Sequence, residues 1–190
     1  MKGRYVKTRS IIVVSLVVGA FALPGSALAE ERVCRGTIGA LTLDNVRVPQ
    51  NATCTLNKTR VRGTVKVERN ATLNAVDVLV IGNVQGENAL DVAVTQGSVI
   101  GGSVQVVQGR RGSVSNSRVD QDILFDSNAG RVSALANIVG GNIQAFQNRG
   151  GVVIQRNNVD GNLQCKANSP APTGGNNVVQ GNKEDQCRRL

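Results

Sequence analysis

Three carboxylates close together in the sequence, Asp120, Asp122 and Asp126, are the first side chains that could do chemistry. Paired carboxylates can act as general acid and base in glycoside hydrolysis, and a cluster of them can bind Ca²⁺. Asp122, however, stands at a position that similar segments of the chain fill with Thr, Ser or Asn, so an outward-facing structural role also accounts for it. We therefore treat the three as candidate binding residues and expect no catalytic residue, no metal site and no cofactor.

Composition excludes several other kinds of active site. The sequence has no His and no Trp, and aromatic residues make up only 2% of its 190 residues. Without His there is no Ser-His-Asp or Cys-His nucleophile, no imidazole zinc site and no haem ligand of the usual kind. The aromatic platforms that bind single-stranded nucleic acid are also missing. We expect a protein that is not an enzyme and has no nucleic-acid partner.

Arginines form the second candidate group. Arg110, Arg131 and Arg149, with Arg69 and Arg111 nearby in the same pattern, follow an Asn-containing turn in successive segments of the chain. If these segments stack, the three side chains line one basic edge, which could contact an anionic polymer such as a cell-surface polysaccharide. The alternative is that they are solvated turn residues that keep the molecule soluble.

Residues 1–29 have the three parts of a secretory signal peptide. A leader with four Lys or Arg residues precedes an apolar stretch over 11–23, and Ala27-Leu28-Ala29 forms a small-residue cleavage site. The apolar stretch is shorter than the roughly 20 residues that a membrane span needs, so we favour cleavage over an uncleaved anchor. The mature domain would cover 30–190, without a membrane span, and lie in the periplasm, cell wall or medium. Cleavage removes four of the 22 basic residues and leaves 18 against 13 acidic ones, a net charge of +5 in place of +9.

The mature chain repeats with a period of about 20 residues. The motif Val-x-Gly-Asn-Val-Gln recurs at 80–85, 139–144 and 159–164, with weaker copies between and around them. Its Gly position falls, at spacings of 19 or 20, at Gly63, Gly82, Gly102, Gln121, Gly141, Gly161 and Gly181. Apolar residues lie two positions before and two positions after this Gly, and polar residues lie between them, which is the alternation of a strand.

Such a strand cannot complete its hydrogen bonds inside one repeat, but stacked repeats can pair in parallel about 4.8 Å apart. The sequence therefore predicts an all-β fold, a single-domain parallel β-helix of about 7 to 8 coils. Coils of this length with columns of Asn are similar to those of right-handed helices, so we expect right-handed winding. A β-sandwich is disfavoured because its turn signals recur about every 8 to 12 residues without this longer period.

Asparagine recurs in the turns with the same period. We place Asn51, Asn70, Asn128, Asn148 and Asn168 in one column, and Asn137, Asn157 and Asn177 in another that Ser117 and Ser98 continue. Side-chain amides at this spacing can form a hydrogen-bonded ladder along the stack. The alternative is that Asn is simply frequent in turns.

The four cysteines fit the same period. Cys34 and Cys54 are 20 positions apart, and Cys165 and Cys187 are 22 apart, so each pair spans about one coil. Pairing between the two sets would have to bridge five or more coils, far beyond the Cα separation of roughly 5.5 to 6 Å that a disulfide prefers. We predict one disulfide at each end of the stack.

The segment from Gly161 to Cys187 has the order Gly-Asn-Leu-Gln-Cys, then Pro-Ala-Pro-Thr-Gly-Gly, then Gly-Asn-Lys-Glu-Asp-Gln-Cys. It resembles the C-terminal signature of a group of uncharacterised secreted bacterial β-helix repeat proteins, a resemblance that brings no assigned activity and no catalytic residues. The expected fold is also similar to the polymer-forming bactofilin-like helices, which lack an export signal and terminal Cys pairs. We expect an exported, non-enzymatic structural or surface-binding protein. A carbohydrate-binding, adhesin-like or polysaccharide-active β-helix is the alternative, and the oligomeric state stays open.

Overall fold

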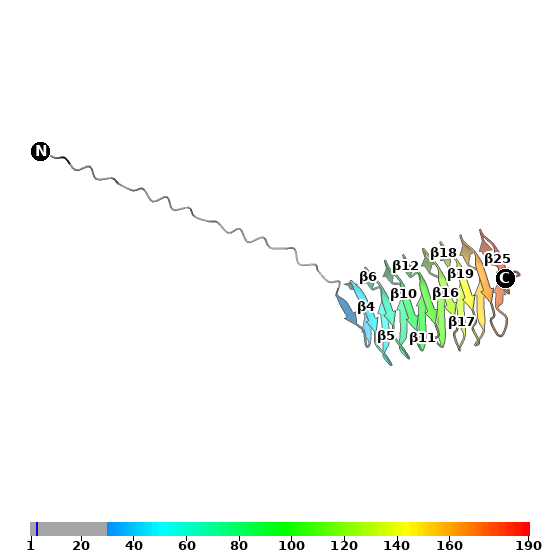
Figure 1. The fold of residues 1–190 in the computed structure, drawn as a ribbon, viewed down its shortest axis with the longest axis horizontal. Helices are drawn as coiled ribbons and strands as arrows, with labels where there is room; N and C mark the ends of the chain where they lie inside the picture. The colour runs from blue at the N-terminus through cyan, green and yellow to red at the C-terminus, as the bar shows by residue number, and fades with distance from the viewer. Residues whose placement is uncertain (1–2, 4–29) are drawn as a thin grey trace.

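A computed structural model describes Gly3 and residues 30–190, so the predicted signal segment lies outside the described residues apart from Gly3. The described chain is all-β and winds as a solenoid with three parallel sheets (Figure 1). Its first and last coils lie at opposite ends of an elongated stack. The predicted fold is therefore confirmed, while the handedness of the winding stays a prediction.

Each coil contributes one strand to each sheet, and we name the sheets A, B and C in the order in which the chain visits them. Sheet A contains β1 (Glu31–Val33), β4 (Asn45–Val48), β7 (Val65–Val67), β10 (Val84–Glu87), β13 (Val104–Val107), β16 (Ile123–Asp126), β19 (Ile143–Phe146), β22 (Leu163–Lys166) and β25 (Lys183–Asp185). Sheet B contains β2 (Thr37–Ile38), β5 (Thr53–Asn57), β8 (Thr72–Val76), β11 (Asp91–Thr95), β14 (Arg111–Ser115), β17 (Val132–Leu135), β20 (Val152–Gln155) and β23 (Thr173–Gly175). Sheet C contains β3 (Thr42–Leu43), β6 (Arg60–Val61), β9 (Leu79–Val80), β12 (Val99–Ile100), β15 (Arg118–Val119), β18 (Ile138–Val139), β21 (Asn158–Val159) and β24 (Val178–Val179).

The repeated motif does not form one continuous strand. In the third coil Val80 ends β9 of sheet C, whereas Val84 begins β10 of sheet A, and the chain turns between them at 81–83. Alternation survives this turn because both valines point into the coil, where each is fully buried. The alternation that the sequence analysis assigned to one strand therefore spans two short strands joined by a bend.

The core is a shaft of stacked aliphatic side chains. Val65 pairs in register with Val84, and Val84 with Val104, and all three are completely buried, as the repeat predicted. Phe125 is the largest side chain in the shaft. Each strand from β4 to β22 buries at least one apolar residue, and this burial supplies the hydrophobic stabilisation that a single coil could not provide for itself.

The chain turns from sheet A to sheet B, and from sheet B to sheet C, through a residue with positive φ. At the first of these turns, which we call the A–B corner, the residues are Asn51, Asn70, Asn88, Gln108, Ser127, Gln147 and Ala167, with φ between 54° and 62°. At the second, the B–C corner, they are Lys58, Asp77, Gln96, Asn116, Ala136, Arg156 and Asn176. Asn tolerates this left-handed conformation better than other side chains do, but the corners also accept Gln, Ala and Arg.

The first predicted amide ladder is formed at the A–B corner, by the residues that directly follow the positive-φ residue. Asn148 donates from Nδ2 to Asn168 Oδ1 (2.9 Å) and to Phe125 O (3.0 Å), and its Oδ1 accepts from Nδ2 of Asn128 (2.9 Å). Both Asn128 and Asn148 are fully buried. The ladder ends on Gln186, whose Oε1 accepts from Asn168 (3.1 Å).

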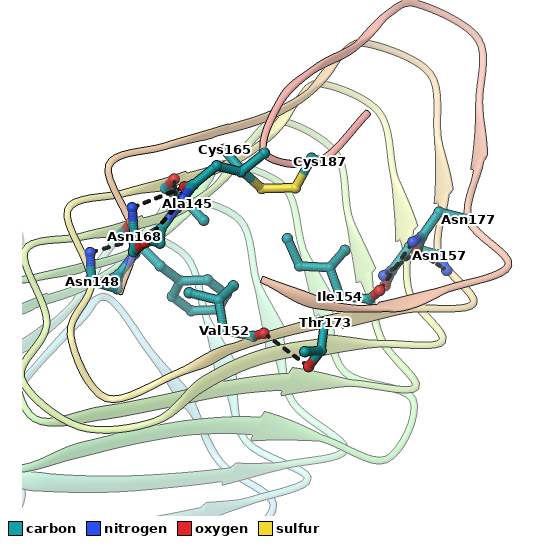
Figure 2. Close-up of a disulfide and its surroundings, with 12 residues drawn as sticks. Ala145, Asn148, Val152, Ile154, Asn157, Cys165, Asn168, Thr173, Asn177 and Cys187 are labelled. Atoms are coloured by element: carbon teal, nitrogen blue, oxygen red, sulfur yellow. Dashed lines mark hydrogen bonds between the residues drawn. A yellow bond between two sulfur atoms is a disulfide. The ribbon is translucent and has the colours of Figure 1, made fainter. Parts of the chain in front are cut away.

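Our placement of Asn51 and Asn70 in this ladder was wrong. Both occupy the preceding, exposed, positive-φ position, and Ala52 and Ala71 stand where the buried ladder runs in later coils. The second predicted ladder, at the B–C corner, is confirmed. Asn137 donates to Asn157 (3.0 Å) and Asn157 to Asn177 (2.9 Å), as Figure 2 shows for the latter pair.

The turn from sheet C back to sheet A, the C–A corner, explains the glycine column. Here a polar side chain accepts from the backbone of the next coil, as Asn142 Oδ1 does from the N of Asn162 (2.8 Å). A Cβ on Gly161 would lie 2.6 Å from that same Oδ1. Two coils lack this Gly: the first has Asp44, and a later one has Gln121, where the preceding coil carries the shorter Ser103.

Disulfides close both ends of the stack, and their predicted pairing is confirmed. Cys34 is bonded to Cys54, with Cα atoms 5.5 Å apart, and Cys165 to Cys187, with Cα atoms 5.2 Å apart (Figure 2). All four are buried at 2% exposure or less. Each bridge ties a terminal coil, which has a neighbour on one side only, to the coil next to it.

Candidate functional site

The three candidate carboxylates lie at two different corners. Asp120 and Asp122 belong to the C–A corner that follows β15, whereas Asp126 ends β16, next to the A–B corner. The length of a sheet A strand therefore separates Asp126 from the other two. Within residues 30–190, no three side chains of His, Cys, Asp or Glu converge as a metal site would require.

Each of these carboxylates has a partner in its own chain. Asp120 accepts from Nε of Arg118 (2.7 Å), and Ser127 donates through Oγ to Asp126 (2.9 Å). Asp122 Oδ1 accepts from both the backbone N (2.7 Å) and Nδ2 (3.0 Å) of Asn142 in the next coil. The Asp122 carboxylate thus takes the place of the Asn and Ser side chains that hold the other coils together, as its column suggested.

The candidate arginines follow the A–B corner on three consecutive coils, and Arg131 lies level with Arg111 because Gly112 and Val132 pair in register. Arg110 and Arg149 follow the A–B corner, where their backbone N atoms donate to Ala89 O and Asn128 O of the preceding coils (2.9 Å each). Arg131 immediately precedes β17 in the coil between them. Neighbouring coils are about 4.8 Å apart, so the three side chains are spread over about 10 Å of the stack. We call these three residues the arginine edge.

The arginine edge carries uncompensated positive charge. All three guanidinium groups are exposed, and none forms an ion pair with another described residue, whereas neighbouring Arg111 binds Asp91 (3.0 Å). An exposed row of like charges raises the local concentration of anions, an effect that salt weakens over a screening length of about 10 Å at 0.1 M. The edge is therefore suited to an extended anion rather than to a small enclosed one.

Two shallow depressions on sheet B meet at Arg131. One, of about 270 Å³, is lined by Arg111, Ser113 and Ser133, and the other, of about 280 Å³, by Gly151, Thr173 and their neighbours. Asp91 also lines the first depression, and Val153 and Pro170 line the second. A polymer that lay across the arginine edge could rest on this face, with Arg131 at the middle of the contact.

A third depression, of about 250 Å³, lies on the outer face of sheet A and was missed by the sequence analysis. Lys66, Gln85, Glu87, Gln105 and Val107 line it. Nε2 of Gln85 donates to Gln105 (3.4 Å), so the two amides belong to a row of Gln side chains that Leu124 interrupts. The signal was present as a polar column with the repeat period, but nothing in a column of exposed Gln distinguishes a site from a solvated face.

Ionic contacts also fasten the first coils. Arg47 binds Glu31 through Nε (2.6 Å) and Glu68 through Nη1 (3.5 Å). The hydrogen bond to Glu31 raises the pKa of Arg47 above its ordinary value, so this guanidinium stays charged throughout the accessible pH range. These partners connect three consecutive coils on the outside of sheet A.

No family model, curated protein or solved structure matches this chain. The resemblance of its C-terminal segment to secreted bacterial repeat proteins therefore stays a prediction. Across the residues that the structure describes, no helix is long and apolar enough to cross a membrane.

Proposed function

We propose that this chain is an exported, non-enzymatic solenoid that binds an anionic polymer, such as an acidic polysaccharide of a cell surface, along its arginine edge. The observation that supports the proposal most is that Arg110, Arg131 and Arg149 follow the same corner on three consecutive coils, without an acidic partner among the described residues. The solenoid holds these side chains at a fixed spacing because each is attached next to a hydrogen-bonded corner. Because the backbone at these positions is already fixed, binding of a linear polyanion has to order the arginine side chains only.

The carboxylates are better suited to structure than to catalysis. Asp122 is occupied by two donors from Asn142, and Asp120 by Arg118. A general acid or base needs an oxygen within reach of substrate and a partner carboxylate across the scissile bond. We therefore propose a scaffold and binding role for this face of the molecule.

Export is part of the proposal. Two buried disulfides are typical of proteins that fold in an oxidising compartment, which supports a location outside the cytosol. Expression in a secretion-competent bacterium should yield a mature chain that begins at Glu30. An intact N-terminus on the exported protein would contradict this part.

The binding test compares alginate, a polyanion, with dextran, a neutral glucan. The wild-type chain should bind alginate at about 50 mM salt and lose at least tenfold in affinity at about 500 mM, because screening weakens exposed charges. The triple variant Arg110→Ala, Arg131→Ala and Arg149→Ala should bind at least tenfold more weakly at low salt.

The matched control removes the same charge elsewhere. The triple variant Arg156→Ala, Arg188→Ala and Arg189→Ala also loses three exposed arginines, none of them on the arginine edge. Its affinity should stay within about threefold of the wild type. An equal loss in both variants, or equal binding to dextran, would refute a specific polyanion edge.

A second candidate is the binding of an uncharged carbohydrate at the sheet A depression. This hypothesis is favoured by the paired amides of Gln85 and Gln105 beside the apolar Val107, since amides and a small apolar surface suit hydroxylated ligands. Salt-independent dextran binding that Gln105→Ala abolishes would support this candidate over the arginine edge. Release of reducing sugar that falls in Asp122→Asn or Asp126→Asn would instead indicate a polysaccharide-active protein.

A further inference from the structure

Three Asn-x-Thr segments lie near the N-terminal end of the stack (Figure 1), and each has the sequence of an N-glycosylation acceptor. They are Asn51-Ala52-Thr53, Asn57-Lys58-Thr59 and Asn70-Ala71-Thr72. An enzyme that modifies a folded chain has to reach both the asparagine and the threonine hydroxyl. The three segments differ in how well the folded coil presents these two groups.

Asn57 is the least suitable acceptor. It is exposed at the end of β5, but its threonine, Thr59, is only 1% exposed. Oγ1 of Thr59 donates to Gly39 O (2.8 Å) in the preceding coil. A buried hydroxyl that is already hydrogen-bonded could reach an enzyme only if this coil opened.

Asn70 is presented much better. It is exposed at the positive-φ position of the A–B corner, and its side-chain amide has no hydrogen bond to another described residue. The backbone around it is fixed, because N of Asn70 donates to Asn88 O (2.9 Å) and N of Ala71 donates to Glu68 O (3.0 Å). Thr72 begins β8 at an outward, half-exposed position. The corner therefore holds a free amide and a hydroxyl on the outside of the molecule.

The residue two positions earlier distinguishes Asn70 from Asn51, which occupies the same corner position one coil before. Asn70 follows Glu68, whose side chain is 30% exposed, whereas Asn51 follows Pro49, which is buried. Oε2 of Glu68 accepts from the backbone N of Gln50 (3.0 Å), and this bond holds the carboxylate beside the corner. A carboxylate has about four acceptor sites, so it can still accept a charge-assisted hydrogen bond from a basic side chain of an enzyme.

We propose that Asn70 is the acceptor of a glycan from a bacterial-type oligosaccharyltransferase, whose peptide site binds the Glu68 carboxylate together with the side chains of Asn70 and Thr72. The substrate class is a glycan activated as a polyprenyl diphosphate. The inference rests on the proposed export, because lipid-linked donors of this kind are used on the outer side of the cytoplasmic membrane.

The transfer is a substitution at the anomeric carbon of the donor glycan. Nδ2 of Asn70 forms a bond to C1 of the first sugar, while the bond from C1 to the diphosphate oxygen breaks and leaves its electron pair on the diphosphate. The amide gives one of its two protons to a base of the transferase. No atom is oxidised or reduced, so the lipid-linked donor is the only co-reactant.

The corner can carry this glycan without a change in the fold. Ala71, the next residue, is fully buried and keeps its contacts, because only the exposed side chain at 70 is modified. Asn51 lies in the adjacent coil about 4.8 Å away, which is about the width of a sugar ring. A glycan on Asn70 thus obstructs the addition of a second one to Asn51, and we expect one glycan per chain.

The test uses the purified, disulfide-bonded chain with a bacterial oligosaccharyltransferase and its polyprenyl diphosphate-linked glycan. After reduction, trypsin places Asn70 on peptide 70–110 and the other two asparagines on peptide 48–58. Mass spectrometry should find one glycan on peptide 70–110, and modification of peptide 48–58 should be at least tenfold slower. This reaction does not depend on export, so a chain that stays in the cytosol of living cells would contradict the proposed export and not the acceptor.

Variants separate recognition of the site from the stability of the coil. Glu68→Gln should slow the transfer at least tenfold, whereas Glu68→Asp, which keeps the charge, should stay within about threefold of the wild type. Arg47 retains its contact with Glu31 in both, so their thermal unfolding should match. Asn70→Gly should abolish the modification in a folded chain, because Gly adopts positive φ freely.

Asn51→Gly is the matched control, since it makes the same change at the same corner position one coil earlier. It should leave the transfer to peptide 70–110 unchanged. An unmodified peptide 70–110 in the wild type would overturn the proposal. So would equally fast modification of peptide 48–58, or transfer at the full rate in Glu68→Gln.

Discussion

At the scale of single residues, the structure separates two kinds of Asn that look alike in the sequence. Asn148 is fully buried, whereas its neighbour Gln147 takes the positive-φ position and points to solvent. Asn148→Ala would leave the side-chain amide and backbone N of Asn128 without their shared acceptor in a dry interior. Each unsatisfied buried group costs about 1 to 3 kcal/mol, so we expect a loss of about 3 kcal/mol in the free energy of unfolding, measured in urea.

The neighbouring position supplies the control. Gln147→Ala should change the free energy of unfolding by less than about 1 kcal/mol, since no buried hydrogen bond is lost. Gln147→Gly should be neutral or slightly stabilising, because Gly adopts positive φ without a steric penalty. Equal losses at 147 and 148 would contradict the assignment of the ladder to the second position.

Gly161 gives a second prediction at this scale. Gly161→Ala should destabilise the protein by about 1 to 3 kcal/mol, because its Cβ would press on Asn142 Oδ1 at 2.6 Å and on Gly141 O at 2.7 Å. Asn142→Ser should relieve part of this strain, as the natural combination of Ser103 with Gln121 suggests. A double-mutant cycle in urea should therefore show a favourable coupling of about 1 kcal/mol, and strict additivity would contradict the clash.

At the scale of elements, the period determined most of what the sequence could predict. The nearly constant spacing of Val65, Val84 and Val104 required stacked parallel strands, and a similar spacing predicted the cysteine pairs. The split into sheets C and A was not predictable from alternation, since a bend that keeps both flanking side chains inward leaves the pattern intact. The sequence did not reveal that the ladder lies one residue after Asn51 and Asn70. Coils differ slightly in length, and the extra residue falls at the corners, so counting from one coil to the next can miss a shift of one position.

The candidate sites were predictable to different degrees. The arginine edge follows from the period, because residues that succeed the same corner must lie on the same side of the stack. The carboxylates were close in sequence, but a strand rises about 3.3 Å per residue, so the length of β16 separates Asp122 from Asp126.

The terminal disulfides are predicted to act on the end coils. Replacement of Cys165 and Cys187 by Ser opens a loop with a sequence separation of 22, for which the chain-entropy model predicts a loss of about 3 kcal/mol. Because β25 pairs with one neighbour only, its amides should also exchange much faster in this variant. Hydrogen-exchange mass spectrometry should find the central strands β10 to β16 still protected. Uniform loss of protection along the chain would contradict an end-localised role.

At the scale of the whole molecule, stability should be a sum over coils and their contacts with neighbours, as in other solenoids. Deletion of residues 143–162 removes one complete coil and joins Asn142 to Leu163, which is in register with Ile143. Asn128 would then stack on Asn168, and Asn137 on Asn177, so that both ladders and both disulfides persist. We expect this variant to fold. The slope of its unfolding free energy against urea concentration should fall by about one eighth, in proportion to the surface lost.

A deletion of half that length distinguishes additivity over whole coils from a general tolerance of deletions. Removal of residues 143–152 joins Asn142 to Val153, so a strand of sheet B would follow the C–A corner and every later ladder residue would lose its column. That variant should lose cooperative unfolding and β-type circular dichroism, although it removes fewer residues. The shorter deletion is expected to be the more damaging one because a coil, and not a residue, is the unit that can be added or removed. Equal stability of the two variants would mean that the stacked columns do not determine the fold.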